Sequence, residues 1–270
     1  MENYITCNLK QRTGNLMFQI AHGYSQSLLN KRRFILPKNV EESLHLQKNL
    51  FRYFDFGLEE LPDVKYTTSS FEYQKLKINE NSPTVFDGWF QSEKFFEPHK
   101  GIIKNLFYPP SYFIDKIKEE LPFIFNHTTL AINVRRGDYL HMPGGHPVIT
   151  TDYINEALKH VPKCERILVM SDDIEWCREN IHLDNVHFNE TYWDQEGIWL
   201  LALCDHFIIS NSSFSWWGAY LSKTPHKVVV CPDTWFGPEI QVDTRDLFCP
   251  GWIKIPTQWK DGFLTLRDIN

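Results

Sequence analysis

Two adjacent arginines follow directly on a run of apolar and β-branched residues in the stretch AINVRRGDYL, residues 131–140. The run predicts a buried strand of a parallel sheet, so Arg135 and Arg136 would emerge at its carboxyl end, where such sheets bind ligands. A guanidinium is permanently charged, and its planar fork fits two phosphate oxygens. The pair therefore indicates a diphosphate ligand, with Asp138 holding one arginine in position. The alternative is a structural Arg–Asp ion pair at a domain interface.

Small polar residues follow another apolar run in the stretch ISNSSFSWWGAYL, residues 209–221. They lead into a predicted helix, so backbone N–H groups and serine hydroxyls can cradle a phosphate at the helix N-terminus. The hydroxyls in question belong to Ser212, Ser213 and Ser215. The alternative is an ordinary serine cap that precedes two core tryptophans, Trp216 and Trp217.

A third stretch, QRTGNLMFQ at residues 11–19, also has the pattern of strand, turn and helix. Arg12 precedes Gly14 and Asn15 here, and it is placed to reach across a cleft to the same ligand. Taken alone, the stretch indicates a plain turn and the start of a helix.

The second half of the chain alternates between strand and helix patterns. Short, nearly continuous apolar runs predict strands at 129–134, 166–170, 206–210 and 227–232. Helix patterns among them begin at Thr151, Asp173, Glu196 and Ser213. This alternation predicts an α/β fold with a doubly wound parallel sheet.

The first half opens with a similar unit, an apolar strand at 4–7 followed by a turn and a helix pattern. Residues 33–37 predict a second strand, and residues 110–121 an amphipathic helix. A proline-containing connector precedes the apolar run at 129, so we place a domain boundary near residues 122–128. Two Rossmann-like domains, residues 1–125 and 126–270, would then face each other across a cleft.

Composition restricts the class of protein. Hydrophobic residues make up 42% and charged residues 23% of the chain, which indicates a globular fold. The net charge of −6 disfavours a dedicated nucleic-acid binder. The N-terminus lacks the pattern of a secretory signal, and no apolar stretch is long enough to span a bilayer. A cytoplasmic protein is therefore expected.

Cysteine and histidine spacing gives no metal site. The six cysteines are scattered with no C-x-x-C pair, so neither a zinc cage nor a disulfide framework is expected. His141 and His146 flank the loop MPGG without ligand spacing, and loop histidines are the favoured interpretation.

Five stretches in this order resemble the α-1,2-fucosyltransferases of glycosyltransferase family 11. They are RTGNLMFQIA (12–21), GWFQSEKFF (88–96), VRRGDY (134–139), SDDIEWCREN (171–180) and SNSSFSWWGAYL (210–221), and together they span most of the chain. The resemblance implies a GT-B-like fold, in which two Rossmann-like domains flank a donor cleft. The N-terminal domain would lie on the acceptor side, and the C-terminal domain would bind GDP-fucose. In this arrangement the last residues of the chain can pack back on the N-terminal domain.

The resemblance also implies roles for individual residues. Arg135 would neutralise the donor diphosphate, with Arg136 and Asp138 supporting the site. The phosphate and nucleoside end would be bound by Ser212, Ser213 and Phe214. The cleft would be closed against the donor by Arg12, Gly14 and Asn15.

The chain departs from the family pattern at several positions. Asn133 stands where the family usually has His, Leu16 where it has Gln, and Gln11 where it has Gly. An acidic residue common in the family is Gly197 here, with Glu196 adjacent. Since such an acid helps related enzymes to recognise guanine, this departure bears on the identity of the donor.

The expected reaction transfers L-fucose from GDP-fucose to the 2-hydroxyl of a galactoside, with inversion at the anomeric carbon. No Asp-x-Asp motif is present, so arginines and backbone dipoles would replace a metal ion, and no cofactor would be required. Asp138 and Glu93 are candidate bases. Trp89 and Phe90 would either stack on the acceptor ring or fill the core.

Two other functions stay open from the sequence. One is transfer of a different sugar by the same scaffold, and the other is non-catalytic glycan binding by the aromatic residues. The expected partners are a nucleotide sugar and a galactose-terminated oligosaccharide, without nucleic acid or a transmembrane segment. The missing anchor favours a microbial or viral type of chain, soluble in the cytoplasm or peripheral to a membrane.

Overall fold

The computed structural model describes residues 3–38, 50–62, 65–68, 71–76, 78 and 82–268. The chain forms two compact units. Unit 1 comprises residues 1–108 and 242–249, and unit 2 comprises residues 109–241 and 250–270. The chain thus passes between the units three times, and each unit contains its own parallel sheet.

The main sheet of unit 2 has the strand order β11-β10-β9-β5-β7-β8, and every neighbouring pair is parallel. The strands are β5 (Thr129–Val134), β7 (Arg166–Ser171), β8 (Val186–Phe188), β9 (His206–Ile208), β10 (Val229–Pro232) and β11 (Ile253–Ile255). In chain order this is the 3-2-1-4-5-6 arrangement of a doubly wound sheet. Its order reverses between β5 and β9, which marks the expected ligand position.

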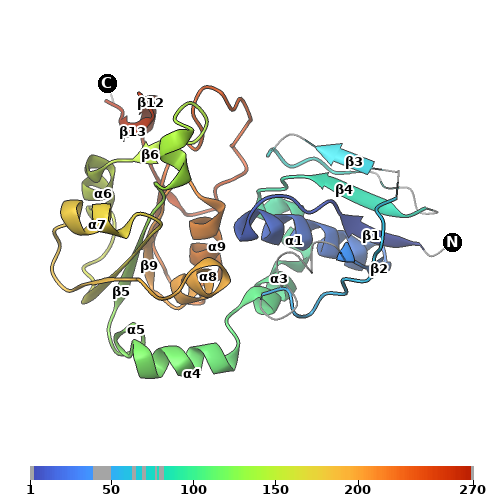
Figure 1. Cartoon of the computed structure of the whole chain (residues 1–270), viewed down its shortest axis with the longest axis horizontal. Coiled ribbons are helices and arrows are strands. Elements are labelled where there is room, and N and C mark those ends of the chain that lie inside the picture. Colours follow the sequence, from blue (N-terminus) through green and yellow to red (C-terminus); the bar gives the residue numbers. More distant parts are fainter. Residues whose placement is uncertain are drawn as a thin grey trace. The chain divides into compact units, whose positions relative to one another are not determined.

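Helices cover both faces of this sheet. They are α6 (Thr151–Leu158), α7 (Ile174–Asn180), α8 (Asp194–Ala202) and α9 (Ser213–Leu221). Figure 1 shows α6 and α7 on one side of the strands and α8 and α9 on the other. All six side chains of β5 are buried, as expected for a strand in a sheet that helices cover on both faces. The α/β fold and the strands and helices predicted for residues 129–232 are therefore confirmed.

The last described residues belong to unit 2. Strands β12 (Thr257–Lys260) and β13 (Phe263–Leu266) form an antiparallel hairpin, and β13 pairs with β6 (Val148–Ile149). The segment that returns to unit 1 is instead Val242–Cys249. There Asp246 accepts hydrogen bonds from the backbone of Tyr73 and from Lys94 Nζ.

The first boundary between the units follows Tyr108 and differs from the predicted division at residue 125. Helices α4 (Ser111–Glu120) and α5 (Phe123–Asn126) belong to unit 2. The ring of Phe113 packs 5.5 Å from Tyr192 and 5.3 Å from Trp199, measured between centroids. Burial of this apolar face fixes α4 on unit 2, which a proline pattern in the sequence does not reveal.

The sheet of unit 1 has the strand order β2-β1-β4-β3 and is also parallel. Its strands are β1 (Tyr4–Cys7), β2 (Arg33–Phe34), β3 (Lys65–Thr68) and β4 (Thr84–Gly88). Helix α1 (Thr13–Leu29) connects β1 to β2. The chain continues after β4 with two short 3-10 helices, η2 (Glu93–Phe95) and η3 (Glu97–His99), and with α3 (Lys100–Phe107).

Many aromatic residues fill the cores of the two units. Trp199, Trp216 and Trp217 are fully buried in unit 2, and Phe18, Phe86 and Phe90 are fully buried in unit 1. All six cysteines are free thiols, and five of them are buried. Within the described residues, every helix is too short or too polar to span a bilayer.

Candidate functional site

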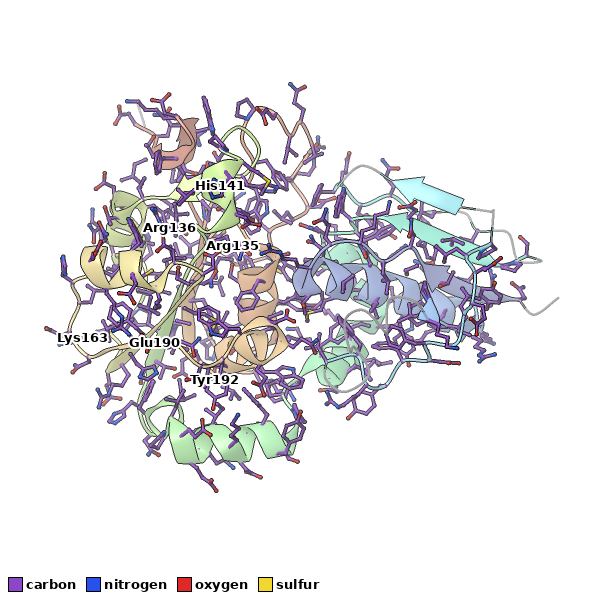
Figure 2. The ribbon with its side chains drawn as sticks, viewed as in Figure 1. Arg135, Arg136, His141, Lys163, Glu190 and Tyr192 are labelled. Carbon is purple, nitrogen blue, oxygen red and sulfur yellow. The ribbon has the colours of Figure 1, made fainter. Side chains whose placement is uncertain are left out.

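Three loops of unit 2 meet at the carboxyl edge of its sheet. They follow β5, β9 and β7, and β5 pairs with the other two strands. Arg135 and Arg136 leave β5, Asp172 and Asp173 leave β7, and the turn 209–212 leaves β9. Figure 2 shows Arg135 and Arg136 together at this end of the sheet. The site therefore lies where the strand order reverses, as parallel topology predicts.

Arg135 is held by two carboxylates. Its Nη2 lies 2.5 Å from Asp138 Oδ1, and its Nη1 lies 2.8 Å from Asp172 Oδ2. The guanidinium also lies over the ring of Tyr139, 5.3 Å from the centroid. The Arg135 side chain is only 21% exposed, and these contacts fix its orientation at the carboxyl edge of the sheet.

Arg136 has a separate set of partners. Its Nε donates to Asp173 Oδ2 at 3.0 Å, and its guanidinium lies 4.0 Å from the ring centroid of Trp176. Its backbone N–H donates to Asp172 Oδ1 at 2.8 Å. Arg136 therefore anchors the loop to the segment after β7, while Arg135 contacts Tyr139, which hydrogen-bonds to the turn after β9.

Asp172 contacts both arginines, although no role was predicted for it from the sequence. The signal was present in the sequence, because Asp172 and Asp173 follow a neighbouring predicted strand at the same edge. A Cβ at Gly137 would lie only 2.4 Å from Asp172 Oδ2. Glycine is therefore needed here for the close approach of Asp172.

Tyr139 links the arginine loop to the turn after β9. Its hydroxyl donates to the backbone oxygen of Asn211 at 3.1 Å, and its ring stacks on His146 with centroids 4.8 Å apart. Burial raises the pKa of Tyr139 to about 12, with a smaller opposing effect from Arg135. Tyr139 therefore stays protonated at neutral pH and serves as a hydrogen-bond donor.

Asn133 links the three strands just below the site. Its Nδ2 donates to the Met170 backbone oxygen at 3.1 Å, and its Oδ1 accepts from Ser210 Oγ at 3.0 Å. Met170 lies on β7 and Ser210 follows β9, so one buried carboxamide joins both neighbours of β5. The position where the resemblance expected His thus has a structural role that an amide fulfils without titrating.

The turn after β9 leads into α9 as predicted. Ser212 is the N-cap residue of α9, although its hydroxyl makes no capping hydrogen bond, and Ser213 is the first helical residue. Ser215 differs from the expectation, because its buried hydroxyl donates to the backbone oxygens of Ser210 and Ser212. Ser215 therefore shapes the turn, and the prediction that its hydroxyl cradles phosphate is wrong.

Asn211 fastens this turn to two other loops. Its Nδ2 donates to the backbone oxygens of Pro147 and Trp235, at 3.0 and 2.9 Å. The loop around Gly144 and Gly145 is in turn hydrogen-bonded to the segment at Gly237. The backbone around the turn is therefore fixed before any ligand arrives.

Phe214 packs on α8 at the position where the family pattern has an acid. A Cβ at Gly197 would meet Phe214 Cζ at 2.8 Å and the Tyr192 backbone oxygen at 3.2 Å. A side chain at residue 197 is thus incompatible with this place of the Phe214 ring. The departure at Gly197 and the position of Phe214 are physically linked.

The two loop histidines have different environments. His141 is exposed, whereas His146 is partly buried between Tyr139 and Phe236. Burial lowers the pKa of His146. Among the described residues, no group of three His, Cys, Asp or Glu side chains is arranged as metal ligands would be.

The third predicted group lies in unit 1, at the N-terminus of α1. Arg12 is exposed and is the N-cap residue, Gly14 is buried and Asn15 is partly exposed. The backbone N–H of Asn15 donates to the Arg12 oxygen at 2.9 Å. These residues belong to a different unit from Arg135, Arg136, Asp138, Ser212, Ser213 and Phe214.

Polar residues also gather where the strand order of unit 1 reverses, between β1 and β4. Asp87 accepts hydrogen bonds from Lys10 Nζ at 2.5 Å and from Asn8 Nδ2 at 3.0 Å. Gln91 Nε2 donates to Asn15 Oδ1 at 2.7 Å. The sequence analysis missed Asp87 and Gln91, because β4 was not predicted.

Trp89 and Phe90, the two aromatic residues after β4, differ in burial. Phe90 is fully buried, and its ring stacks on His22 with centroids 4.1 Å apart. Its proposed stacking on an acceptor sugar is therefore excluded, and the core alternative is correct. Trp89 is partly exposed, and Glu93 begins η2 with partial exposure.

Comparison with known proteins identifies relatives over nearly the whole chain. An α-1,2-colitosyltransferase of Escherichia coli is 28% identical, covering 93% of this chain and 98% of that protein. The O-antigen biosynthesis glycosyltransferase WbnK of Escherichia coli is 27% identical over 76% of this chain and 69% of its own. The bovine galactoside 2-α-L-fucosyltransferase SEC1 is 26% identical over 80% of this chain and 64% of its own.

Solved structures agree with the fold. The fucosyltransferase NodZ from Bradyrhizobium has a TM-score of 0.55 with this chain at 13% identity, covering 85% of this chain and 96% of NodZ. NodZ α-1,6-fucosyltransferase co-crystallised with GDP also gives a TM-score of 0.55, at 14% identity. The chain therefore has the α/β fold of GT-B-type fucosyltransferases.

The sequence profile of glycosyl transferase family 11 matches residues 1–256. This match confirms the resemblance seen in the five stretches, and it excludes a purely glycan-binding protein of unrelated origin. The chain belongs to glycosyl transferase family 11 and is a glycosyltransferase.

Proposed function

We propose that the protein is an inverting α-1,2-fucosyltransferase that moves L-fucose from GDP-fucose to the 2-hydroxyl of a galactoside. The observation that carries the proposal is that Arg135 follows β5 while the turn ending at Ser212 follows its neighbour β9, at the strand-order reversal of unit 2. A diphosphate at this position would meet a guanidinium on one side and the N-terminus of α9 on the other.

The proposed role of Arg135 is to stabilise the negative charge that develops on the leaving group. Cleavage of the bond to the sugar leaves additional negative charge on the departing diphosphate. A preoriented guanidinium stabilises this charge without reorganisation, and the contacts to Asp138 and Asp172 supply the orientation. Arg136 stays with Asp173 and Trp176, and it acts on the site through the backbone of the loop.

The remaining predicted residues are assigned in the same scheme. Ser212 and Ser213 offer N–H and hydroxyl groups to phosphate, and Phe214 offers a ring to the nucleoside. Arg12, Gly14 and Asn15 of unit 1 are also assigned to contact with the donor. Unit 1 also takes the galactose-terminated acceptor.

Asp138 is one of two candidates for the general base. Its Oδ1 contacts Arg135, and its carboxylate would accept the proton from the attacking hydroxyl. A largely dissociative transition state needs only weak base assistance. Glu93 is the other candidate from the sequence.

One comparison supports an alternative donor, in which colitose replaces fucose. The relative that shares 28% identity over nearly its full length is named an α-1,2-colitosyltransferase. Colitose is the 3-deoxy form of L-fucose, so one hydroxyl separates the two sugars. A site that hydrogen-bonds this hydroxyl would discriminate strongly against the analogue that lacks it.

Donor selection tests the proposal. Isothermal titration is expected to show binding of GDP and much weaker binding of UDP. Turnover is then measured with GDP-fucose and GDP-colitose on β-galactoside acceptors, and linkage and anomeric configuration are read by NMR. An α-1,2 fucosyl product supports the proposal, a preference for colitose supports the second candidate, and equal binding of UDP contradicts both.

A further inference from the structure

A single hydrogen bond joins the two polar loops of unit 1. Gln91 Nε2 donates to Asn15 Oδ1 at 2.7 Å, across 76 residues of sequence. Asn15 lies in the first turn of α1, and Gln91 lies in the loop after β4. The GWFQSEKFF stretch that contains Gln91 belongs to the family resemblance, yet none of the roles assigned above explains the glutamine.

The loop that carries Gln91 is held rigidly on both sides. Phe90, the preceding residue, has a positive φ of 51° and a ring buried against His22. Ser92, the following residue, is buried, and its hydroxyl accepts from the Lys94 backbone N–H at 3.2 Å. Gln91 itself is only 5% exposed. A side chain so fixed can impose its geometry on a partner.

The bond determines which way the Asn15 carboxamide faces. Its oxygen points to Gln91, so its Nδ2 group points to the opposite side. Among the residues that the structure describes, Asn15 makes no other side-chain hydrogen bond. Asn15 is partly exposed, so its two N–H donors are available to an oxygen of a ligand.

We propose that Gln91 is a positioning residue, which turns the Asn15 amide so that Nδ2 donates to an oxygen of the bound nucleotide sugar. This inference rests on the proposed function, in which Asn15 contacts the donor. The oxygen belongs either to the sugar or to the diphosphate, and both offer the same acceptor chemistry.

Substitution at Gln91 tests the orientation. Gln91→Leu removes the donor, and Gln91→Glu replaces it with an acceptor that attracts Nδ2 and turns the amide around. Both variants are expected to lose about tenfold to a hundredfold in kcat/KM for the donor, because misplacing a contact group has effects of this size. Gln91→Glu should lose more than Gln91→Leu.

Asn15→Asp separates a ligand role from a structural one. The aspartate still accepts from Gln91, and a negative charge in the first turn of α1 stabilises the helix. Its Tm is therefore expected to equal or exceed that of the parent protein, while kcat/KM falls as far as in Asn15→Ala. Activity of Asn15→Asp equal to that of the parent would overturn the proposal.

A double-mutant cycle gives the second readout. In an Asn15→Ala background, Gln91→Leu should cause no further loss, because its effect runs through Asn15. The control is Ser27→Ala, which removes a partly buried hydrogen bond to the Tyr24 oxygen near the other end of α1. This control should lower Tm yet keep the donor kcat/KM. Additive losses in the double variant would contradict positioning.

Titration with two ligands locates the oxygen. A Gln91→Leu defect in binding GDP-fucose alone assigns the bond to the sugar, and an equal defect with GDP assigns it to the diphosphate. Unchanged binding of both ligands and unchanged turnover overturn the inference while the parent enzyme stays active. Failure of the proposed function would instead appear as a parent enzyme without fucosyl transfer.

Discussion

Arg135 and Asp172 leave neighbouring parallel strands, and Nη1 of the arginine lies 2.8 Å from Oδ2 of the aspartate. The same carboxylate accepts the backbone N–H of Arg136 through its other oxygen. One side chain thus sets both the guanidinium and the loop that carries it.

Arg135→Lys should reduce kcat by about a hundredfold to a thousandfold, because one ammonium cannot reproduce the planar fork at the charge of the transition state. Circular dichroism and Tm should stay near those of the parent, since the side chain is partly exposed at the sheet edge. The control is Arg178→Ala, which removes a surface arginine paired with Glu190 and should keep kcat. Parent-like turnover by Arg135→Lys would refute the assignment.

Asp172→Asn and Asp172→Ala should lose activity to different extents. The amide oxygen still accepts from the Arg136 N–H, whereas alanine removes both contacts. We expect kcat/KM to fall by about tenfold in Asp172→Asn and by about a hundredfold in Asp172→Ala. Steady-state kinetics measures the order, and equal activity of the two variants would show that the backbone contact has no effect.

Gly197→Ala should weaken nucleotide binding. The new Cβ would lie 2.8 Å from Phe214 Cζ, so the ring must move. Calorimetry with GDP should show about a tenfold rise in Kd if Phe214 contacts the nucleoside, the upper range of a lost aromatic contact. Gly101→Ala is the matched control, because a Cβ there meets nothing within 4 Å and alanine favours its helix.

Acid should destabilise unit 1 through His22. Burial among Phe86, Phe90 and Phe95 lowers the pKa of His22 from 6.5 to about 4. Because the unfolded chain binds this proton at a higher pH than the folded chain, the stability contribution is complete above pH 6.5 and declines towards pH 4. The free energy of unfolding should be lower at pH 5 than at pH 7, by about 2 kcal/mol from this group.

Urea denaturation of two variants checks the cause of this pH dependence. In His22→Phe, the free energy of unfolding should change less between pH 7 and pH 5 than in the parent, whatever the stability of the variant at pH 7. His182→Gln, which changes an exposed histidine, should keep the slope of the parent. An unchanged slope in His22→Phe would assign the effect to other groups.

Transfer activity should persist in EDTA. The proposed site provides its positive charge through Arg135 and the N-terminus of α9, which a chelator does not remove. The measurement compares initial rates with and without EDTA, before and after addition of Mg²⁺ or Mn²⁺. Loss of turnover in EDTA that is restored by a divalent ion would contradict the metal-independent mechanism.

The sequence by itself determined four of the six strands in the main sheet of unit 2 and the position of Arg135 at the end of one of them. Continuous apolar runs at 129–134 and 166–170 predict buried parallel strands. Because the first of these strands ends at Val134, Arg135 lies at the carboxyl edge of the sheet. Local patterns of this kind are properties of short segments, which is why sequence reasoning can read them.

Only the tertiary structure decided how side chains far apart in sequence meet. Asp172 bonds to Arg135, Gln91 bonds to Asn15, and Phe90 lies in the core against His22 and is unavailable to a sugar. The division after Tyr108 likewise depends on Phe113 packing against Tyr192 and Trp199. Such contacts arise from the closing of long loops and from burial of whole surfaces, and no short segment of the sequence contains that information.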